Sequence, residues 1–527
     1  MPPLPPIHLA AGSAAPLSFF DELGRERLFH GTNAITKGPP FYPVHDSFSP
    51  DISMSSEDFV WMEKLGLNVL RLGVMWPGVE PTEGVYDESY LDHISAIVDL
   101  ASSHNVYTLL DMHQDGLSEF FCGEGLPPWA VRHTDSFHEK RGYPFPFDSP
   151  MDPDLDFYNE PLFPSSPALP TRQACHSKNQ GPGWHEPTVA SANAYQAFYS
   201  NVDGTLDKWA AMWAHVADRF KGRPEVLGIE LINEPFAGDL YHDPLIMVPR
   251  PNPHNADRVN LQPAYELASG KIWEADPDRL VFFDGVTWGD LGAGFSSAPG
   301  GPDLANKTVL GFHYYAPPQL DPTGGHAALQ FKAQARVGGK LGSGVFLTET
   351  SQPDLGRGAD DTFSIKGGIG DAADSQLQSW AGYEWKSFCR ESTETADAPS
   401  QMGEWGACKT GYSDNWDGDE PSEGFQTANG RTFASAVAGT TRAMSYDVDS
   451  KAFELEYEVN GASFGEGAQT EIFCRPEHYP DGVQVEVLEG GHGVEATWDA
   501  DLSKVLVQVN GLESGDTVKV RVSNDGN

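Results

Sequence analysis

The chain has 527 residues, of which 39% are hydrophobic and 11% aromatic, so its composition excludes global disorder and its length predicts one large domain with a smaller one. Lys and Arg number 34 against 76 Asp and Glu, which gives a net charge of −42. Such a charge disfavours nucleic acid and anionic membrane surfaces as partners. Because the acids are spread along the chain, we interpret them as a solubility device rather than an acidic tail.

Residues 1–24 are expected to form an N-terminal arm. They are rich in proline, and no basic residue precedes Arg25, so the chain as it stands shows no signal peptide, although a leader could have been removed. A single glycosylation sequon at Asn306 slightly favours a secreted or endomembrane-lumen location over the cytoplasm. The five cysteines show no metal-binding spacing, and Cys122 and Cys175 could pair because both lie in one long loop.

Eight short runs follow between residues 25 and 430, and most are apolar throughout, as expected for strands buried on both faces. They are Arg27–Ile35, Val69–Val74, Val106–His113, Val226–Glu234, Leu280–Val286, Val309–Tyr315, Gly344–Thr350 and Trp380–Lys386.

Helical patterns separate several of these runs. Ser55 or Ser56 can cap a helix that ends at Gly66. Residues 87–105 and 205–220 each place apolar side chains on one face. The repeated alternation of strand and helix predicts an α/β fold, a (β/α)₈ TIM barrel over residues 25–430.

The sequence changes character after about residue 440. Runs such as FELEYEV, KVLVQVN and TVKVRVS alternate apolar and polar residues, with turn residues between most of them. This pattern predicts a C-terminal antiparallel β-sandwich over residues 431–527. It carries no obvious chemistry, so we interpret it first as a structural cap on the barrel.

Two long insertions, residues 114–200 and 236–262, interrupt the predicted barrel and follow its third and fourth strands. The first is rich in proline and aromatic residues, and the second contains LIMVPRPNP. Loops that follow barrel strands lie on the active face. Their apolar residues either hold an apolar part of a substrate or pack against one another.

Polar residues cluster at the expected C-terminal ends of the barrel strands, where a barrel concentrates its chemistry. The candidates are Lys37, Arg71, His113, Asp115, Asn233, Glu234, His313, Tyr315, Glu349 and, on the eighth strand, Trp380. Glycoside hydrolysis uses two carboxylates and no metal or cofactor, and in retaining enzymes these carboxylates lie about 5–5.5 Å apart. Glu234 and Glu349 end strands four and seven, which face each other across a barrel mouth.

The motifs RLG, DMHQD, NEP and HYY, with a late glutamate, resemble glycoside hydrolase family 5. More narrowly, HGTNAITKGPPFYP, DMHQD, INEPF and TEIFCRPEHYPDG resemble endoglycoceramidases and their fungal and protist relatives, over roughly residues 20–515. The resemblance implies a retaining enzyme with Glu234 as general acid/base and Glu349 as nucleophile.

The resemblance also implies roles for the other candidates. Supporting residues would be Arg71 and Tyr315 beside Glu349, His113 and His313 as orienting groups, and Asn233 on the sugar 2-hydroxyl. Tyr314 would replace Tyr315 if the sixth strand were misregistered. Sugar-binding residues would be Lys37 and Asp115 on hydroxyls, Trp380 under the ring and Trp184 as a further aromatic wall.

Glu404, in the motif GEWG, is a rival nucleophile. We prefer Glu349 because GVFLTET is an apolar, β-branched run that ends in the acid, whereas SQMGEWG lacks such a run. The family usually continues its nucleophile motif as Glu-Phe-Gly. Thr350 and Ser351 stand there instead, which leaves the substrate open.

We expect hydrolysis of the bond between sugar and lipid in glycosphingolipids, with peripheral contact to lipid aggregates. The alternatives are a β-glucosidase acting on glucosylceramide or sterol glucoside, and a polysaccharide endo-hydrolase that cleaves glucan or mannan. A non-enzymatic glycolipid-binding protein is the least favoured, because Glu234, Glu349, Arg71 and Asn233 are all present.

Overall fold

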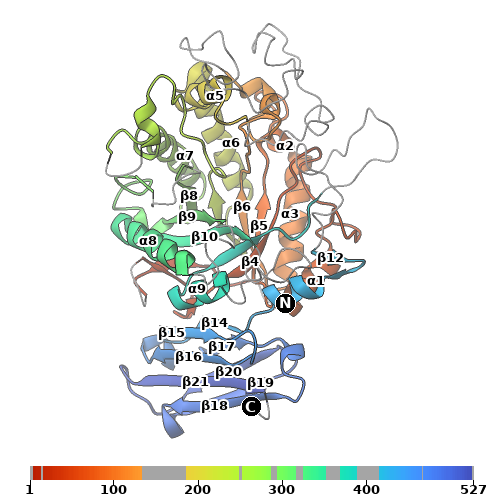
Figure 1. The fold of residues 1–527 in the computed structure, drawn as a ribbon, viewed down its shortest axis with the longest axis vertical. Coiled ribbons are helices and arrows are strands. Elements are labelled where there is room, and N and C mark those ends of the chain that lie inside the picture. The colour runs from red at the N-terminus through yellow and green to blue at the C-terminus, as the bar shows by residue number, and fades with distance from the viewer. Residues whose placement is uncertain are drawn as a thin grey trace.

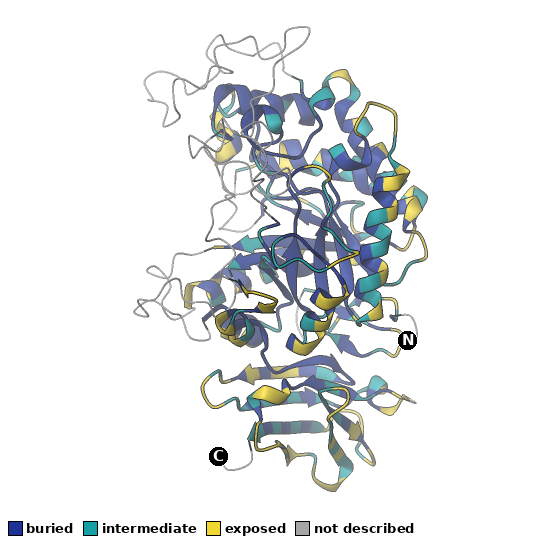
Figure 2. Ribbon diagram, turned by 90° about the vertical axis from the view of Figure 1, so that its right-hand side faces the viewer, coloured by how far each residue is buried: buried dark blue, intermediate teal, exposed yellow. Residues whose placement is uncertain are grey.

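The computed structural model consists of a barrel stacked on a β-sandwich (Figure 1). Figure 2 shows that the barrel strands are mostly buried, whereas burial alternates along several sandwich strands. Three predicted residues, Trp184, Cys175 and Glu404, lie outside the described part of the chain. The structure describes residues 4–12, 16–132, 185–248, 252–286, 293–315, 325–351, 368–388, 415–465 and 467–524.

Eight parallel strands form the closed barrel, and each lies within one of the eight predicted runs or overlaps it closely. The first strand pairs with both the second and the eighth, which closes the sheet. This confirms the predicted TIM barrel. The strands are β4 (His30–Ala34), β5 (Val69–Gly73), β6 (Tyr107–Asp111), β7 (Val226–Glu230), β8 (Val281–Asp284), β9 (Thr308–Tyr314), β10 (Gly344–Ser351) and β11 (Trp380–Tyr383).

Helices surround the barrel, and the first shows why the sequence signals were readable. Ser55 caps α1 through a capping box with Asp58, and Gly66 ends it at φ 72°, a conformation that suits glycine. The described helices are α1 (Ser56–Leu65), α2 (Trp76–Val79), α3 (Glu88–Ser103), α5 (Val189–Tyr199), α6 (Thr205–Arg219), α7 (Gln262–Ala275), α8 (Gly325–Leu341), α9 (Gly368–Gln376) and α10 (Glu423–Asn429). Among the described residues, no helix is both long and apolar enough to cross a membrane.

The predicted sandwich is confirmed, and the N-terminal segment contributes to it. One sheet has seven strands in the order β1-β2-β3-β14-β17-β20-β19, and the other has four in the order β15-β16-β21-β18. Their bounds are β1 (His8–Ala10), β2 (Ser18–Phe20), β3 (Glu26–Arg27), β14 (Phe433–Val437), β15 (Thr440–Tyr446), β16 (Phe453–Glu458), β17 (Thr470–Phe473), β18 (Val483–Glu489), β19 (Val494–Asp499), β20 (Lys504–Val509) and β21 (Thr517–Asn524). A two-stranded ribbon, β12 (Trp416–Asp417) and β13 (Glu420–Pro421), precedes α10.

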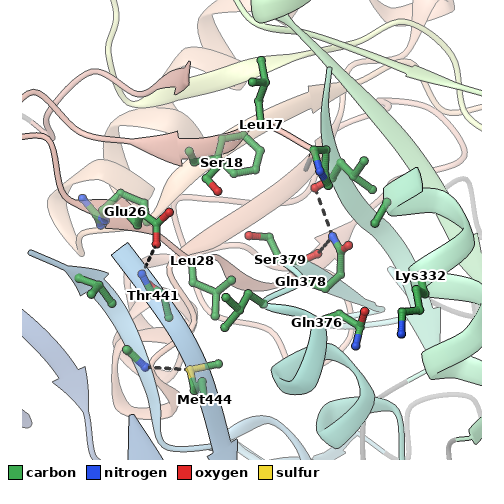
Figure 3. A pocket seen from close by; sticks show the side chains of 18 of the residues that line it. Leu17, Ser18, Glu26, Leu28, Lys332, Gln376, Gln378, Ser379, Thr441 and Met444 are labelled. Atoms are coloured by element: carbon green, nitrogen blue, oxygen red, sulfur yellow. Dashed lines mark hydrogen bonds between the residues drawn. The ribbon is translucent and has the colours of Figure 1, made fainter. Parts of the chain in front are cut away.

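The N-terminal segment also closes the lower end of the barrel. Leu4, Leu9 and Phe19 join an apolar cluster with inward-facing side chains from the first halves of the strands, such as Phe29 and Phe346. A pocket lies where this segment, α8, α9 and the sandwich meet, and Figure 3 shows Leu28, Gln378 and Met444 around it. The barrel is therefore sealed below, and its chemistry is confined to the opposite end, where the strands finish.

Candidate active site

Glu349 is 4% exposed and held by charged groups. Arg71 Nη1 donates to its Oε1 at 2.6 Å, and the Tyr315 hydroxyl donates to its Oε2 at 2.8 Å. Burial alone would raise the pKa of Glu349, but the positive charges of His313, Arg71 and His113 outweigh burial and lower this pKa to about 2. Glu349 is therefore a carboxylate at neutral pH.

Glu234 lies in the loop that follows β7, since the strand ends at Glu230 rather than continuing through Glu234 as the sequence suggested. Its φ of 37° falls in the left-handed region, which costs a residue other than glycine about 1–3 kcal/mol. Gln114 holds this turn, because its Nε2 donates to the carbonyl oxygens of Asn233 and Glu234 at 2.9 and 2.6 Å. This turn of the backbone therefore fixes the position of the Glu234 Cα and the direction in which its side chain leaves the chain.

His313 lies between the two glutamates. Its Nδ1 is 2.7 Å from Glu234 Oε1 and 3.5 Å from Glu349 Oε2. One carboxylate oxygen of each glutamate lies within 4.8 Å of the other and of the imidazole. Burial would lower the pKa of His313, but Glu349, Glu234 and Asp284 outweigh burial and raise this pKa to about 9, so the ring carries a proton at neutral pH.

Arg71 is fully buried and organises the floor of the site. Besides Glu349, it pairs with Glu230 at 2.5 Å and Asp111 at 3.1 Å, and its Nη2 donates to Asn233 Oδ1 at 2.9 Å. Asn233 Nδ2 in turn donates to the carbonyl oxygen of Gln114 at 3.0 Å. This network fixes the amide of Asn233 beside the two glutamates.

A second group of charges lies beside the first. His113 Nδ1 is 2.9 Å from Asp111, and His113 Nε2 is 3.5 Å from Asp115. Burial opposes protonation, but these two carboxylates raise the pKa of His113 to about 10. Lys37 Nζ donates to Asp115 Oδ2 at 2.5 Å, so the predicted sugar-binding pair is a nearly buried ion pair at the same end of the barrel.

The expectation that Trp380 lies under the sugar is wrong. Trp380 begins β11, at the lower end of the barrel, and is 1% exposed. Its ring packs 4.6 Å from that of His30, and His30 in turn stacks on Phe433 of the sandwich. The aromatic residue that reaches the mouth from β11 is Tyr383, whose ring stacks 6.2 Å from that of His113 and lies 5.5 Å from Lys37 Nζ.

Several other site residues were not among the candidates drawn from the sequence. Gln114 holds the Glu234 turn, and Glu230 and Asp284 are buried acids whose pKa values are raised by burial. Glu186 is also buried, and burial together with Asp115 and Glu234 raises its pKa to about 8. Gln114, Glu230 and Asp284 lie at or just after strand ends, which was the available signal, whereas Glu186 lies within the long insertion of residues 114–200.

Three residues remain predictions because the described part of the chain does not include them. Trp184 and Glu404 lie outside it, so the aromatic wall and the rival nucleophile are untested. Cys122 is disulfide-bonded, but Cys175 lies outside the described residues, so their pairing also stays a prediction.

Chemically, the arrangement offers one carboxylate held ionised and a second, partly exposed carboxyl group beside it. One oxygen of Glu234 and one of Glu349 lie within 4.8 Å of each other, which is close to the separation of about 5–5.5 Å between the two carboxyl groups of retaining glycosidases. Both groups face a mouth that also offers hydrogen-bonding and aromatic side chains.

Two family models together, and each of two curated relatives, match most of the chain. A cellulase (glycosyl hydrolase family 5) model matches residues 40–143 and 176–431, and a glycoside hydrolase family 5 C-terminal domain model matches residues 431–522. Endoglycoceramidase from Cyanea nozakii is 36% identical over 94% of this chain and 90% of its own length, and endoglycoceramidase from Hydra vulgaris is 36% identical over 89% and 81%.

A solved structure supports the same fold. Endo-glycoceramidase II from Rhodococcus sp. superposes with a TM-score of 0.65 at 21% identity, covering 96% of this chain and 99% of that one. At this identity the likeness speaks for the fold alone. Together with the matches that span both the barrel and the sandwich, these findings show that the chain is a glycoside hydrolase that belongs to glycoside hydrolase family 5.

Proposed function

We propose that this enzyme hydrolyses the glycosidic bond between sugar and lipid in glycosphingolipids, with retention of configuration. The observation that carries the proposal is the pair Glu234 and Glu349, whose oxygens lie within 4.8 Å at the barrel mouth with Glu349 held ionised. The substrate class is supported by the two relatives named endoglycoceramidase, which match at 36% identity over most of the chain.

The proposed reaction has two displacements. Glu349 attacks the anomeric carbon while Glu234 gives its proton to the departing lipid oxygen, which leaves a covalent glycosyl-enzyme and free lipid. Water then attacks the same carbon, Glu234 takes a proton from it, and the bond to Glu349 breaks. Two inversions at one carbon return the original β configuration.

Each supporting residue has a proposed task in these steps. Arg71 and Tyr315 restrain the Glu349 carboxylate in the attacking position. His313, in contact with both glutamates, balances their charges as the proton moves. Asn233 is aligned by Arg71, and we assign its amide to the sugar 2-hydroxyl, a contact that strengthens in the transition state.

Lys37, Asp115 and Tyr383 are proposed to bind the sugar. The ion pair of Lys37 and Asp115 presents a donor and an acceptor to hydroxyl groups, and the neighbouring Tyr383 ring offers an apolar face for a sugar ring. Lys37 and Asp115 follow β4 and β6, and Tyr383 ends β11, so their contacts converge on one side of the mouth.

The loop after β7 offers an apolar surface for the lipid. Leu245, Met247 and Val248 are exposed there, and Val259 is exposed where the chain returns toward α7. Ile246 anchors this loop by packing with Ala237 and Ala256. We propose that this surface contacts the lipid part of glycolipid aggregates.

A substrate panel tests the proposal. The purified chain is incubated with a ganglioside, glucosylceramide, a sterol glucoside and a soluble β-glucan, and each product is identified by mass spectrometry. We expect intact oligosaccharide and ceramide from the ganglioside. A proton NMR time course should show the oligosaccharide appearing first as the β-anomer. Cleavage of the glucan alone would refute the glycolipid assignment, and release of the α-anomer would refute retention.

The catalytic assignment is tested with Glu349→Gln and Glu234→Gln. Both should lose activity on the ganglioside. On a substrate whose leaving group needs no proton, such as a dinitrophenyl β-glycoside, Glu234→Gln should release a burst of dinitrophenol and then slow, because the glycosyl-enzyme is left without its base for the attack of water, whereas Glu349→Gln should show no burst. Glu404→Gln is the matched control for the rival nucleophile. Full activity of Glu349→Gln beside an inactive Glu404→Gln would overturn the assignment.

The lipid surface is tested with a Leu245→Ser, Met247→Ser double variant. Each exposed apolar side chain that enters lipid contributes on the order of 1 kcal/mol, so the double variant should bind ganglioside micelles roughly tenfold more weakly or worse. Activity on a soluble aryl glycoside should stay unchanged. Leu502→Ser, an equally exposed leucine on the sandwich, is the control, and an equal loss in this control would refute a specific lipid surface.

A further inference from the structure

We propose that Glu124 is a positioning residue that shares a proton with Asp115 and thereby holds Asp115 as a hydrogen-bond acceptor for the sugar. The inference rests on the proposed function for the role of Asp115 in sugar binding. Where the proton resides is a separate claim that needs no activity to be tested.

The backbone brings the two acids together. Asp115 N donates to Glu124 O at 3.1 Å, and Glu124 N donates to Asp115 O at 2.9 Å, so the residues form an isolated antiparallel bridge. A Cβ at Gly123 would lie 1.7 Å from the Asp115 carbonyl oxygen, so only glycine allows this close approach. As a result, oxygens of both carboxyl groups and a nitrogen of His113 lie within 4.8 Å of one another.

The carboxyl group of Glu124 is poorly placed to carry a charge. Glu124 is 2% exposed, and neither of its carboxyl oxygens has a hydrogen-bond partner from a conventional donor in the described part of the chain. The nearest cation, Lys37 Nζ, lies 3.6 Å away and is already bound to Asp115 at 2.5 Å. A buried carboxylate without hydrogen bonds is strongly disfavoured, so the group takes up a proton instead.

Asp115 has the opposite environment. Burial would raise its pKa, but Lys37 and His113 outweigh burial and lower it. For Glu124, burial raises the pKa and the charge of Asp115 raises it further, against the opposing pull of Lys37 and His113. The charged groups that face Glu124 are Lys37, from the loop after β4, and His113 and Asp115, from the loop after β6. With this arrangement the negative charge lies on Asp115 and the proton on Glu124.

The sharing of this proton matters for binding. With Glu124 neutral, its O–H can donate to one Asp115 oxygen while Lys37 holds Oδ2, which fixes the plane of the carboxylate. If Glu124 ionises, two carboxylates share one lysine and repel each other. Asp115 then moves away from the position in which it accepts a sugar hydroxyl, and substrate binding weakens.

Kinetics on ganglioside micelles test this role, with KM and kcat measured from about pH 5 to about pH 9. Glu124→Ala should raise KM about tenfold or more with a much smaller change in kcat, because a hydrogen bond to a charged group is lost from the binding site. Glu124→Gln, which keeps a neutral donor of the same shape, should restore most of the binding. We predict that the KM of wild type rises at high pH and that the KM of Glu124→Gln does not. An unchanged KM in Glu124→Ala, or the same alkaline rise in Glu124→Gln, would overturn the proposal.

Thermal unfolding tests the proton without activity. A group whose pKa is raised by folding stabilises the fold below its unfolded pKa, and this contribution is lost as pH rises toward the folded value. The Tm of wild type should therefore fall relative to that of Glu124→Gln as pH rises above about 4.5, the ordinary value for glutamate. A constant difference would refute the protonated state. If the difference falls but the enzyme is inactive on all glycolipids, the proposed function and the sugar-binding role of Asp115 fail, while the assignment of the proton to Glu124 stands.

Discussion

Replacing Tyr315 by phenylalanine removes one hydrogen bond from the Glu349 carboxylate and leaves the Arg71 contact in place. The lost bond is 2.8 Å long and its acceptor is charged, for which a contribution of about 1.5–3 kcal/mol is typical. Tyr315 is 45% exposed, so solvent screening favours the lower end of that range. Since about 1.4 kcal/mol corresponds to one pKa unit, the pKa of Glu349 should rise from about 2 to about 3.

The assay is the pH dependence of kcat/KM, whose acid limb reports the group that must be ionised in the free enzyme. Glu349 must be ionised to act as the nucleophile. Activity is therefore present above the lowered pKa of Glu349 and is lost as pH falls through that pKa. The acid limb of Tyr315→Phe should therefore move upward by about one unit. Initial rates are taken directly after dilution from neutral stock, so that acid unfolding does not contribute.

Tyr314→Phe is the matched control. Tyr314 ends β9 and directly precedes Tyr315, but its hydroxyl contacts His326 at 3.0 Å rather than Glu349. Its acid limb should coincide with that of wild type. An unmoved acid limb in Tyr315→Phe, or an equal shift in both variants, would refute the reasoning that this hydrogen bond restrains the charge of Glu349.

Three further predictions concern the groups around the glutamates. Arg71→Met should lower the free energy of unfolding by about 3–5 kcal/mol, because it leaves the buried carboxylates of Asp111, Glu230 and Glu349 without their cation. Urea titration measures this change, and an unchanged unfolding midpoint would contradict the network. Gln114→Ala should reduce kcat by about 10–100-fold with a smaller effect on KM, because the turn at Glu234 loses its two hydrogen bonds from the Gln114 side chain. Steady-state kinetics that show an effect on KM alone would exclude this role of Gln114. His313 has a raised pKa, so its contribution to stability is present below about pH 6.5 and is lost as pH rises through about 9. The Tm of wild type should therefore fall relative to that of His313→Gln across this pH range. Parallel plots of Tm against pH for the two proteins would disprove the raised pKa.

The barrel could be predicted because its strands carry their own signal. Runs such as GVFL, which begins β10, are continuously apolar, as strands of a parallel sheet covered on both faces are. The same reasoning placed Glu349 and Tyr315 at the mouth, since Glu349 lies near the C-terminal end of β10 and Tyr315 directly follows β9. It failed for Trp380, because that residue begins its strand and the mouth lies at the other end, where Tyr383 stands.

Other features of the site have no local signature. The φ of 37° at Glu234 depends on Gln114, a residue distant in sequence whose side chain supplies the hydrogen bonds. The pairing of Asp115 with Glu124 depends on how tightly a loop folds back on itself. Both are outcomes of tertiary packing, which a single sequence does not display at the residues concerned.

The seven-stranded sheet joins segments from opposite ends of the chain. Its first three strands come from residues 8–27, and they pair through β3 with β14, which begins at Phe433. During synthesis these strands are made before the barrel, yet their partner β14 emerges only after the whole barrel. The sheet is therefore completed last. A protein cut at residue 431 would lack β14, so the edge of β3 that pairs with β14 would be exposed. Expression of the barrel alone should yield an aggregation-prone fragment, so the two bodies are best treated as one folding unit.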